Sequence, residues 1–247
     1  MQIIRDIEAF SSKEYIVASD GSFDGVHLGH RHILDSVLLG ASNSGGHSMV
    51  ITYSPHPRLV VDSQLDFGIL STVEEKAFLL DRMGFDFLAV IAFTKEFSKI
   101  PADEFLEQYI YGKLCVNELC IGYNHAFGNM RKGNFESAKQ HGKLNVIRMD
   151  ELKVSSQKVS STIIRELICK GDVQKAVELL GHAYVVIGES MDGRRILVDR
   201  SKLLPPEGRY VAYVDGTLSE VIVDSKTLLL NKQMDTNPVI EICSRIV

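Results

Sequence analysis

The stretch Gly21-Ser22-Phe23-Asp24-Gly25-Val26-His27-Leu28-Gly29-His30 decides the fold of this 247-residue chain. A β-branched run from Tyr15 to Ala18 precedes it, and an amphipathic segment from Arg31 to Ala41 follows it. Glycines at positions 21 and 25 permit positive φ and close backbone approach, so amide N–H groups and the helix dipole can hold an anion there. The order strand, turn, helix therefore predicts a phosphate-binding site.

Two histidines, His27 and His30, lie three positions apart, which is about one helical turn. Both imidazoles can then lean toward one polyanion, with only Leu28 and Gly29 between them. Two other interpretations stay open: a pair of surface histidines, or half of a metal site. No Cys or carboxylate repeats at ligand spacing nearby, so phosphate binding is favoured over zinc.

Composition narrows the class of protein. Hydrophobic residues make up 45% of the chain, charged residues 24%, and the net charge is −5, which does not favour a nucleic-acid partner. Four cysteines form no C-x-x-C pair, which predicts a reducing, cytoplasmic compartment; they are Cys115, Cys120, Cys169 and Cys243. No leader or long apolar run suggests a membrane partner, and nothing indicates whether the chain self-associates.

Short β-rich runs alternate with helix-length amphipathic stretches from Tyr15 onward. This alternation predicts an α/β fold with a parallel sheet of Rossmann-like type, preceded by an edge strand within residues 1–13. A capping box at Ser71 and Glu74 is expected to open one helix, and Pro101 another that runs through Tyr111. The predicted strands are Tyr15–Ala18, Ser48–Tyr53, Phe87–Phe93, Glu118–Ile121 and Leu144–Arg148.

Ligands of open α/β sheets bind beyond the carboxyl ends of the strands, so the segments after the strands are candidates for chemistry. After the second strand, Pro55 and Pro57 fix a loop that presents His56. The segment after the fourth strand, 122–134, combines aromatic, amide and cationic side chains, which suits a flat aromatic ligand with a phosphate. Plainer interpretations remain: His56 binds a loop carbonyl, Phe127 is core, and Arg131 with Lys132 forms a solvated turn.

A second phosphate clamp is predicted at Val159-Ser160-Ser161-Thr162-Ile163-Ile164-Arg165. Ser161 or Thr162 is a candidate N-cap, so helix N-terminal amides and Arg165, one turn on, can bind the same anion. A plain capped helix explains the hydroxyl groups equally well.

Five blocks in this order resemble the adenylyltransferase module of the bacterial FAD synthetase (FMN adenylyltransferase)/riboflavin kinase family. The His-x-Gly-His turn alone is similar to the wider nucleotidyltransferase superfamily, whereas the set is specific to this family. The blocks are the turn at 21–30, Ser-Pro-His-Pro at 54–57, Gly-Tyr-Asn-His-Ala-Phe-Gly at 122–128, Ser-Ser-Thr-Ile-Ile-Arg at 160–165 and Leu-Leu-Gly-His-Ala-Tyr at 179–184.

The resemblance implies transfer of AMP from ATP to FMN, which gives FAD and pyrophosphate with the help of Mg²⁺; ATP and FMN are the small-molecule partners. It implies catalytic roles for His27, His30 and Arg165. Positions implied to bind ATP are Gly21, Ser22, Phe23, Asp24, Gly29, Ser160, Ser161 and Thr162. Positions implied to bind FMN are Pro55, His56, Asn124, Phe127 and Arg131.

The chain departs from the family pattern at two places. Ala126 stands where many relatives carry a basic residue, and residues 188–199 lack the Gly-x-Pro-Thr-Ala-Asn block of the kinase module. We therefore expect a nucleotidyltransferase domain at 1–182, a truncated β-barrel remnant at 183–247, and no riboflavin kinase activity. Two alternatives remain: a flavin- or nucleotide-binding protein without turnover, and a nucleotidyltransferase that uses another phosphate acceptor.

Overall fold

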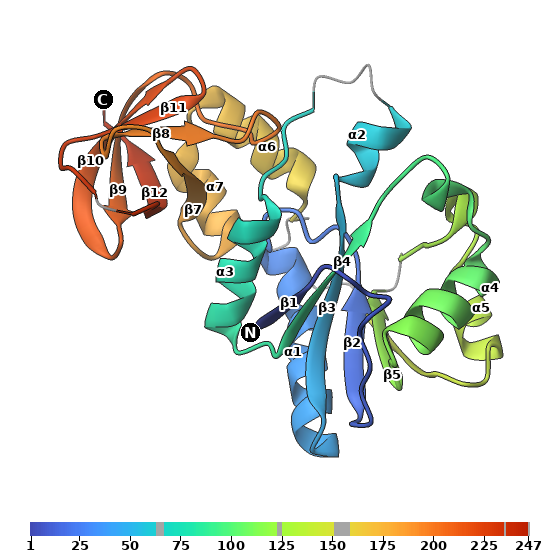
Figure 1. Cartoon of the computed structure of the whole chain (residues 1–247). Coiled ribbons are helices and arrows are strands. Elements are labelled where there is room, and N and C mark those ends of the chain that lie inside the picture. Colours follow the sequence, from blue (N-terminus) through green and yellow to red (C-terminus); the bar gives the residue numbers. More distant parts are fainter. Residues whose placement is uncertain (63–66, 123–124, 151–158, 235, 247) are drawn as a thin grey trace. The chain divides into compact units, whose positions relative to one another are not determined.

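The computed structural model describes residues 1–62, 67–122, 125–150, 159–234 and 236–246 (Figure 1). Contacts group these residues into two compact units. The first comprises the described parts of 1–23, 30–65 and 77–152, and the second those of 24–29, 66–76 and 153–247. The boundary predicted at residues 182 and 183 concerns functional modules and stays a prediction.

The first unit is built on a six-stranded, fully parallel sheet with the order β1-β4-β3-β2-β5-β6. Figure 1 shows β2, β3 and β4 side by side. The predicted α/β class is confirmed, and the N-terminal edge strand is β1. The strands are β1 (Gln2–Ile4), β2 (Ile16–Asp20), β3 (His47–Ser54), β4 (Phe87–Ala92), β5 (Glu118–Gly122) and β6 (Asn145–Met149).

Both faces of this sheet are covered, which explains its continuous apolar runs. Helix α1 (Leu28–Ser44) buries Leu34, Val37 and Ala41. It packs closely, since a Cβ on Gly40 would lie 3.1 Å from Val17 Cγ1. The alternate residues of β2, Ile16 and Ala18, belong instead to a core shared with the helical region at 102–113. Helices on both faces make the three layers of a Rossmann-like fold.

The remaining helical segments of this part of the chain are mostly short. They are α2 (Pro57–Val61), α3 (Val73–Met83), η1 (Phe97–Lys99), α4 (Ala102–Glu104), η2 (Phe105–Lys113), η3 (Asn129–Arg131) and α5 (Phe135–Gln140). The single α-helix predicted from Pro101 to Tyr111 is wrong in its helix type, because only α4 is α-helical and η2 has π-helical hydrogen bonding. The loop predicted around Pro55, His56 and Pro57 is also wrong in part, because Pro57 begins α2.

The capping box of α3 lies one residue later than predicted. The Thr72 backbone N–H donates to Glu75 Oε2 at 2.8 Å, and the Glu75 N–H donates to Thr72 Oγ1 at 3.3 Å. The hydroxyl oxygen of Ser71 instead accepts the Gly25 N–H at 2.8 Å.

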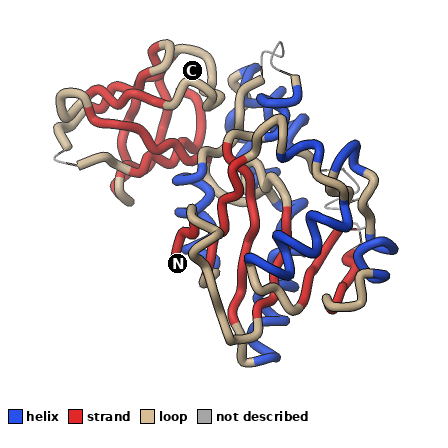
Figure 2. Tube along the Cα trace, turned by 45° about the vertical axis from the view of Figure 1, so that its right-hand side comes forward, coloured by secondary structure: helices blue, strands red, loops and turns tan. Residues whose placement is uncertain are grey.

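The second unit contains a closed antiparallel barrel with the order β10-β11-β8-β7-β12-β9; Figure 2 shows its strands in red. Two helices, α6 (Ser161–Lys170) and α7 (Val173–Leu180), share one hydrophobic core with the barrel. The small C-terminal β domain is thus confirmed. The strands are β7 (Tyr184–Ser190), β8 (Arg195–Val198), β9 (Gly208–Val214), β10 (Thr217–Asp224), β11 (Thr227–Leu230) and β12 (Val239–Arg245).

A buried ion pair fastens the first turn of α3 to the barrel. Lys202 Nζ lies 2.8 Å from Glu75 Oε2, and both side chains are fully buried. Lys202 also donates to the carbonyl oxygens of Leu70 and Val185, and Glu75 accepts the Ile187 N–H at 2.9 Å. Burial raises the pKa of Glu75 and lowers that of Lys202, so the pair depends on this complete set of partners.

The described residues contain no helix with the length and apolar character needed to cross a bilayer. All four cysteines lie among the described residues, and each is a free thiol.

Candidate functional site

The turn after β2 has an unusual backbone. Positive φ occurs at Gly25 (82°), as the sequence predicts, but also at Phe23 (42°) and Val26 (43°). Gly21 does not have a positive φ. Its Cα instead faces the Phe23 ring, which an added Cβ would approach to 3.2 Å. A β-branched residue with positive φ costs free energy, and such conformations are typical of functional sites.

Asp24 holds this turn in place. Its Oδ1 accepts the N–H groups of Leu70 and Ser71, both at 2.9 Å. Its Oδ2 forms an ion pair with Arg165 Nη2, and only 2% of the Asp24 side chain is exposed. The carboxylate is therefore a structural centre that joins three segments far apart in the sequence.

Arg165 lies in the second turn of α6 with 14% of its side chain exposed. Besides the ion pair to Asp24, its Nε donates to the Gly68 carbonyl at 2.8 Å, and the guanidinium lies 4.2 Å from the centre of the Phe67 ring. The predicted approach of Arg165 to the histidine turn is thus present, through a carboxylate that the sequence analysis assigned only to ATP binding.

His27 and Ser161 meet inside the same unit. His27 Nε2 lies 3.2 Å from Ser161 Oγ, and that hydroxyl donates to the Asp24 carbonyl at 3.1 Å. Since the single hydroxyl proton of Ser161 is donated to Asp24, we assign the hydrogen of the His27 imidazole to Nε2. Burial lowers the pKa of His27 to about 4, against the opposing effect of the Asp24 charge. The imidazole is therefore neutral at pH 7 and offers an uncharged N–H donor.

His27 precedes α1, whose first residue is Leu28, so the two histidines do not share a helix as their spacing suggested. His30 belongs to the first turn of α1, and its ring meets the Phe23 ring edge-on with centroids 5.2 Å apart. Gly29 leaves little room, since a Cβ there would lie 3.0 Å from the His27 ring.

The N-cap of α6 is Ser160 rather than the predicted Ser161 or Thr162. Ser160 has extended φ and ψ, and its Oγ accepts the Ile163 N–H at 3.4 Å. Ser161 is the first helical residue and uses its hydroxyl in the bonds to His27 and Asp24, whereas Thr162 is exposed.

The candidate FMN residues that the structure describes lie in the first unit. Pro55 follows β3, and His56 caps α2 by accepting the Arg58 N–H at Nδ1, 3.2 Å away. Phe127 is buried and stacks on His125, with centroids 5.9 Å apart and an interplanar angle of 28°. Arg131 ends η3, and Asn124 lies outside the described residues.

Sequence reasoning missed a polar cluster at the carboxyl ends of the strands. Asp20, the last residue of β2, accepts hydrogen bonds from Tyr53 Oη and His125 Nε2, both at 2.8 Å. Burial by itself would raise the pKa of Asp20, but the charge of His125 and these hydrogen bonds bring the pKa below its usual value. A carboxylate at the end of a buried strand was the signal that could have identified the cluster.

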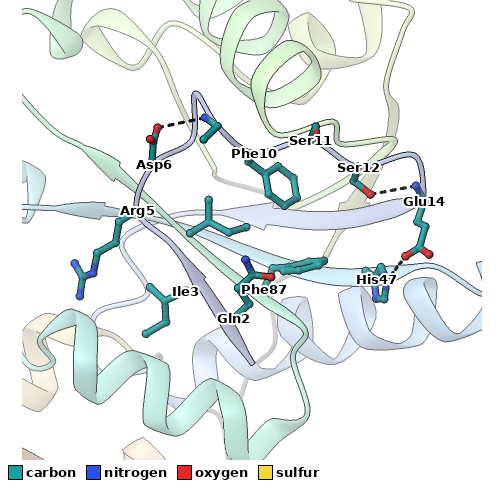
Figure 3. A pocket seen from close by; sticks show the side chains of 12 residues that line it. Gln2, Ile3, Arg5, Asp6, Phe10, Ser11, Ser12, Glu14, His47 and Phe87 are labelled. Atoms are coloured by element: carbon teal, nitrogen blue, oxygen red, sulfur yellow. Dashed lines mark hydrogen bonds and ion pairs between the residues drawn. The ribbon is translucent and has the colours of Figure 1, made fainter.

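A pocket of about 540 Å³ lies at the other end of the sheet. Figure 3 shows its lining, which includes Arg5, Phe10 and the first residues of β3 and β4, His47 and Phe87. The amino ends of parallel strands are not where such sheets bind substrates. Of the predicted site residues that the structure describes, none lines this pocket.

These features define a protein with the fold of a Rossmann-like nucleotidyltransferase, whose first βα turn is built around buried polar groups. The sequence model of the FAD synthetase family matches residues 10–163. The chain therefore belongs to the FAD synthetase family, as its five sequence blocks predicted.

Curated relatives are bifunctional enzymes. The bifunctional riboflavin kinase/FMN adenylyltransferase of Listeria monocytogenes is 29% identical over 204 residues, covering 77% of this chain and 65% of that protein. The bifunctional enzyme of the same name from Haemophilus influenzae is 30% identical over 200 residues, covering 79% of this chain and 65% of that protein. The matches thus span less than two thirds of the length of these relatives.

A solved structure shares the whole architecture. The protein described as a macrolide-efflux protein from Streptococcus pneumoniae superposes with a TM-score of 0.81 and 21% identity, over 99% of this chain and 89% of that one. At this identity the similarity concerns the fold.

Proposed function

We propose that this protein is an FMN adenylyltransferase, which transfers AMP from ATP to FMN and releases FAD and pyrophosphate. The observation that carries the proposal is the junction of the glycine-rich turn and the start of α6 through Asp24, Ser161 and Arg165. The turn and the α6 block are separated by more than a hundred residues, yet both belong to the set that resembles this family.

The triphosphate would be bound by donors from both segments. His27 contributes its neutral Nε2–H, which can exchange its hydrogen bond to Ser161 for one to a phosphate oxygen. His30 contributes a second imidazole. Ser160, Ser161 and Thr162 stand at the start of α6, where amide N–H groups and the helix dipole favour the β- and γ-phosphates. Gly21, Ser22, Phe23, Asp24 and Gly29 form the turn that surrounds the nucleotide.

Arg165 is proposed to hold the same phosphates. In the structure its guanidinium is bound by Asp24 and Gly68, which fixes its position. A guanidinium presents its N–H donors in a planar fork, a geometry that suits phosphate oxygens. Asp24 would thus orient the cation that binds the phosphates.

The flavin would occupy the aromatic side of the first unit, with Pro55, His56, Asn124, Phe127 and Arg131 as its candidate neighbours. Phe127 supplies a ring that is already held by stacking and burial. Ala126 offers no charge to a phosphate, which predicts weaker FMN affinity than a basic residue would give.

Mg²⁺ is proposed to arrive with ATP. The described residues contain no group of three or more His, Cys, Asp or Glu side chains able to hold a metal ion, which agrees with the usual binding of Mg²⁺ through substrate phosphates. When bound, the ion supplies positive charge to the phosphate oxygens.

The reaction needs no protein nucleophile. A phosphate oxygen of FMN attacks the α-phosphorus of ATP in line, the bond to the bridging oxygen of the β-phosphate breaks, and that oxygen leaves with pyrophosphate. Catalysis then consists of positioning and of donors aimed at the developing charge. Each well-placed donor contributes roughly 3 kcal/mol, on the order of a hundredfold in rate.

Incubation with FMN and Mg-ATP, followed by separation of products, tests the proposal. We expect equal amounts of FAD and pyrophosphate, and loss of both in His27→Ala and His30→Ala while FMN binding persists. Binding of FMN without product would support a binding protein without turnover. Failure to bind FMN, measured by flavin fluorescence, would support another phosphate acceptor.

Riboflavin kinase activity is not expected, because residues 188–199 carry no Pro-Thr-Ala-Asn block. Incubation with riboflavin and Mg-ATP should therefore yield no FMN. Clear turnover would overturn this expectation and assign a second active site to the barrel.

A further inference from the structure

The ion pair between Asp20 and His125 lies where the order of the strands in the sheet reverses direction. In the order β1-β4-β3-β2-β5-β6 the chain runs outward from β2 to β3 and β4, then returns to β5 on the other side of β2. The direction of winding therefore reverses between β2 and β5. Asp20 ends β2, and His125 follows β5 by three residues, so their hydrogen bond spans the crevice where open α/β sheets bind ligands.

The same residues close a ring of aromatic contacts. Tyr53 contacts Phe97 with centroids 6.1 Å apart, and Phe97 contacts Phe105 at 6.0 Å. Phe105 contacts Phe127 at 6.0 Å, and Phe127 stacks on His125 at 5.9 Å. Asp20 completes the ring through its hydrogen bonds to Tyr53 and His125.

Backbone hydrogen bonds hold the segment that carries Phe127. Phe127 and Gly133 exchange backbone hydrogen bonds of 3.1 and 2.9 Å, and the His125 N–H donates to the Gly122 carbonyl at 3.0 Å. The imidazole of His125 reaches across to Asp20, whose side chain is 2% exposed. A carboxylate this deeply buried needs a fixed charged or hydrogen-bonded partner, and in return it fixes the plane of the imidazole.

We propose that Asp20 is a positioning residue for the phosphate-bearing aromatic acceptor: through His125 it sets the orientation of the stacked His125 and Phe127 rings. This inference rests on the proposed function, because it takes FMN as the ligand of that surface. The two rings are stacked at the crevice, with Phe127 buried and the His125 side chain 20% exposed. A planar isoalloxazine gains from an aromatic surface that is rigid before binding. Asp20 does not touch the ligand and acts through His125.

Four variants of the full chain test this. Asp20→Asn removes the charge that His125 binds, His125→Phe keeps an aromatic ring but removes its hydrogen bond, and Asp20→Asn/His125→Phe combines them. Tyr53→Phe is the matched control, since it removes the other hydrogen bond to Asp20 and leaves the His125 contact in place.

FMN affinity is measured by quenching of flavin fluorescence, and KM for ATP by steady-state kinetics. We expect Asp20→Asn and His125→Phe each to raise the Kd for FMN about tenfold, as for the loss of one charge-assisted hydrogen bond. The KM for ATP should change less than about twofold. The double variant should be no weaker than His125→Phe alone, because both changes break one link.

The inference is overturned if Asp20→Asn binds FMN as tightly as wild type, if FMN and ATP are affected equally, or if the two single effects multiply in the double variant. If Asp20→Asn does not fold, His125→Phe tests the inference alone: its Kd for FMN should rise while its KM for ATP stays nearly unchanged. Failure of the proposed function is a different result, because the wild-type protein itself would then form no FAD, whether or not it binds FMN.

Discussion

The guanidinium of Arg165 and the carboxylate of Asp24 form an ion pair that ties α6 to the glycine-rich turn, with the Asp24 side chain 2% exposed. Asp24 also accepts two backbone N–H groups, from Leu70 and Ser71. The arginine proposed to bind the phosphates is therefore oriented before ATP arrives, by a carboxylate that is itself fixed by the backbone. Preorganised charge of this kind costs little rearrangement during the reaction.

Arg165→Ala should lower kcat/KM for FAD formation by about a hundredfold or more, because a donor to the triphosphate is lost. Arg165→Lys should recover little, since an ammonium cannot bind Asp24, Gly68 and a phosphate in the same fork geometry. The matched control is Arg209→Ala, which removes an exposed arginine paired with Glu220 on the barrel and should leave the rate unchanged. Equal activity of Arg165→Ala and wild type would remove Arg165 from the site.

Lys202→Met should destabilise the protein by about 3–5 kcal/mol, because it leaves the Glu75 carboxylate buried without its cation. Lys202→Met/Glu75→Gln should recover a large part of this loss. Lys175→Met, which breaks an exposed pair with Asp172, should leave the free energy of unfolding nearly unchanged. Chemical denaturation followed by circular dichroism measures all three, and a Lys202→Met variant as stable as Lys175→Met would contradict the interpretation of the buried pair.

The sheet was predictable from the sequence because its buried parallel strands are short apolar runs separated by helix-length segments. The predicted strands match β2 to β6 within two residues at each end. The π-helix at 105–113 was not predictable, since its apolar spacing resembles that of an α-helix. The N-cap of α6 could not be chosen among Ser160, Ser161 and Thr162, because three consecutive hydroxyl side chains carry the same capping signal.

Contacts between distant segments explain what the sequence missed at the site. Asp24 and Arg165 stand 141 positions apart, and no local pattern links a turn carboxylate to a helical arginine. His27 was predicted to face a polyanion, but its low pKa depends on burial by the folded chain. Asp20 and His125 are likewise joined only by the return of the chain from β4 to β5.

Gly133→Ala should disturb the stacked rings of His125 and Phe127 without touching any polar group. A Cβ at this position would lie 2.4 Å from Phe127 Cε2 and 2.8 Å from Ala102 Cβ, so the ring must move. We expect a destabilisation of about 1–3 kcal/mol and a higher Kd for FMN. In the control Gly122→Ala, the nearest atom is the terminal methyl of Ile33 at 3.1 Å, which can shift. Unchanged FMN affinity in Gly133→Ala, with the fold intact, would separate Phe127 from flavin binding.

The stability of the protein should depend on pH through His27. Its pKa is lowered to about 4 by burial, whereas an unfolded histidine titrates near 6.5. Between these values the unfolded chain binds the proton and the folded chain does not, so this contribution is complete above about pH 6.5 and is lost as the pH falls toward 4. From about pH 7 to about pH 5 the loss from this single group amounts to about 2 kcal/mol.

His27→Gln removes this titration, so its free energy of unfolding should fall about 2 kcal/mol less than that of the wild type over the same pH interval. Denaturation curves of both proteins at each pH give this difference directly, because all other titrating groups are common to the two chains. His27→Asn provides a second comparison with a shorter side chain. The same pH dependence in wild type and both variants would mean that His27 titrates as an exposed histidine does, and the neutral Nε2–H donor assigned to it would then be wrong.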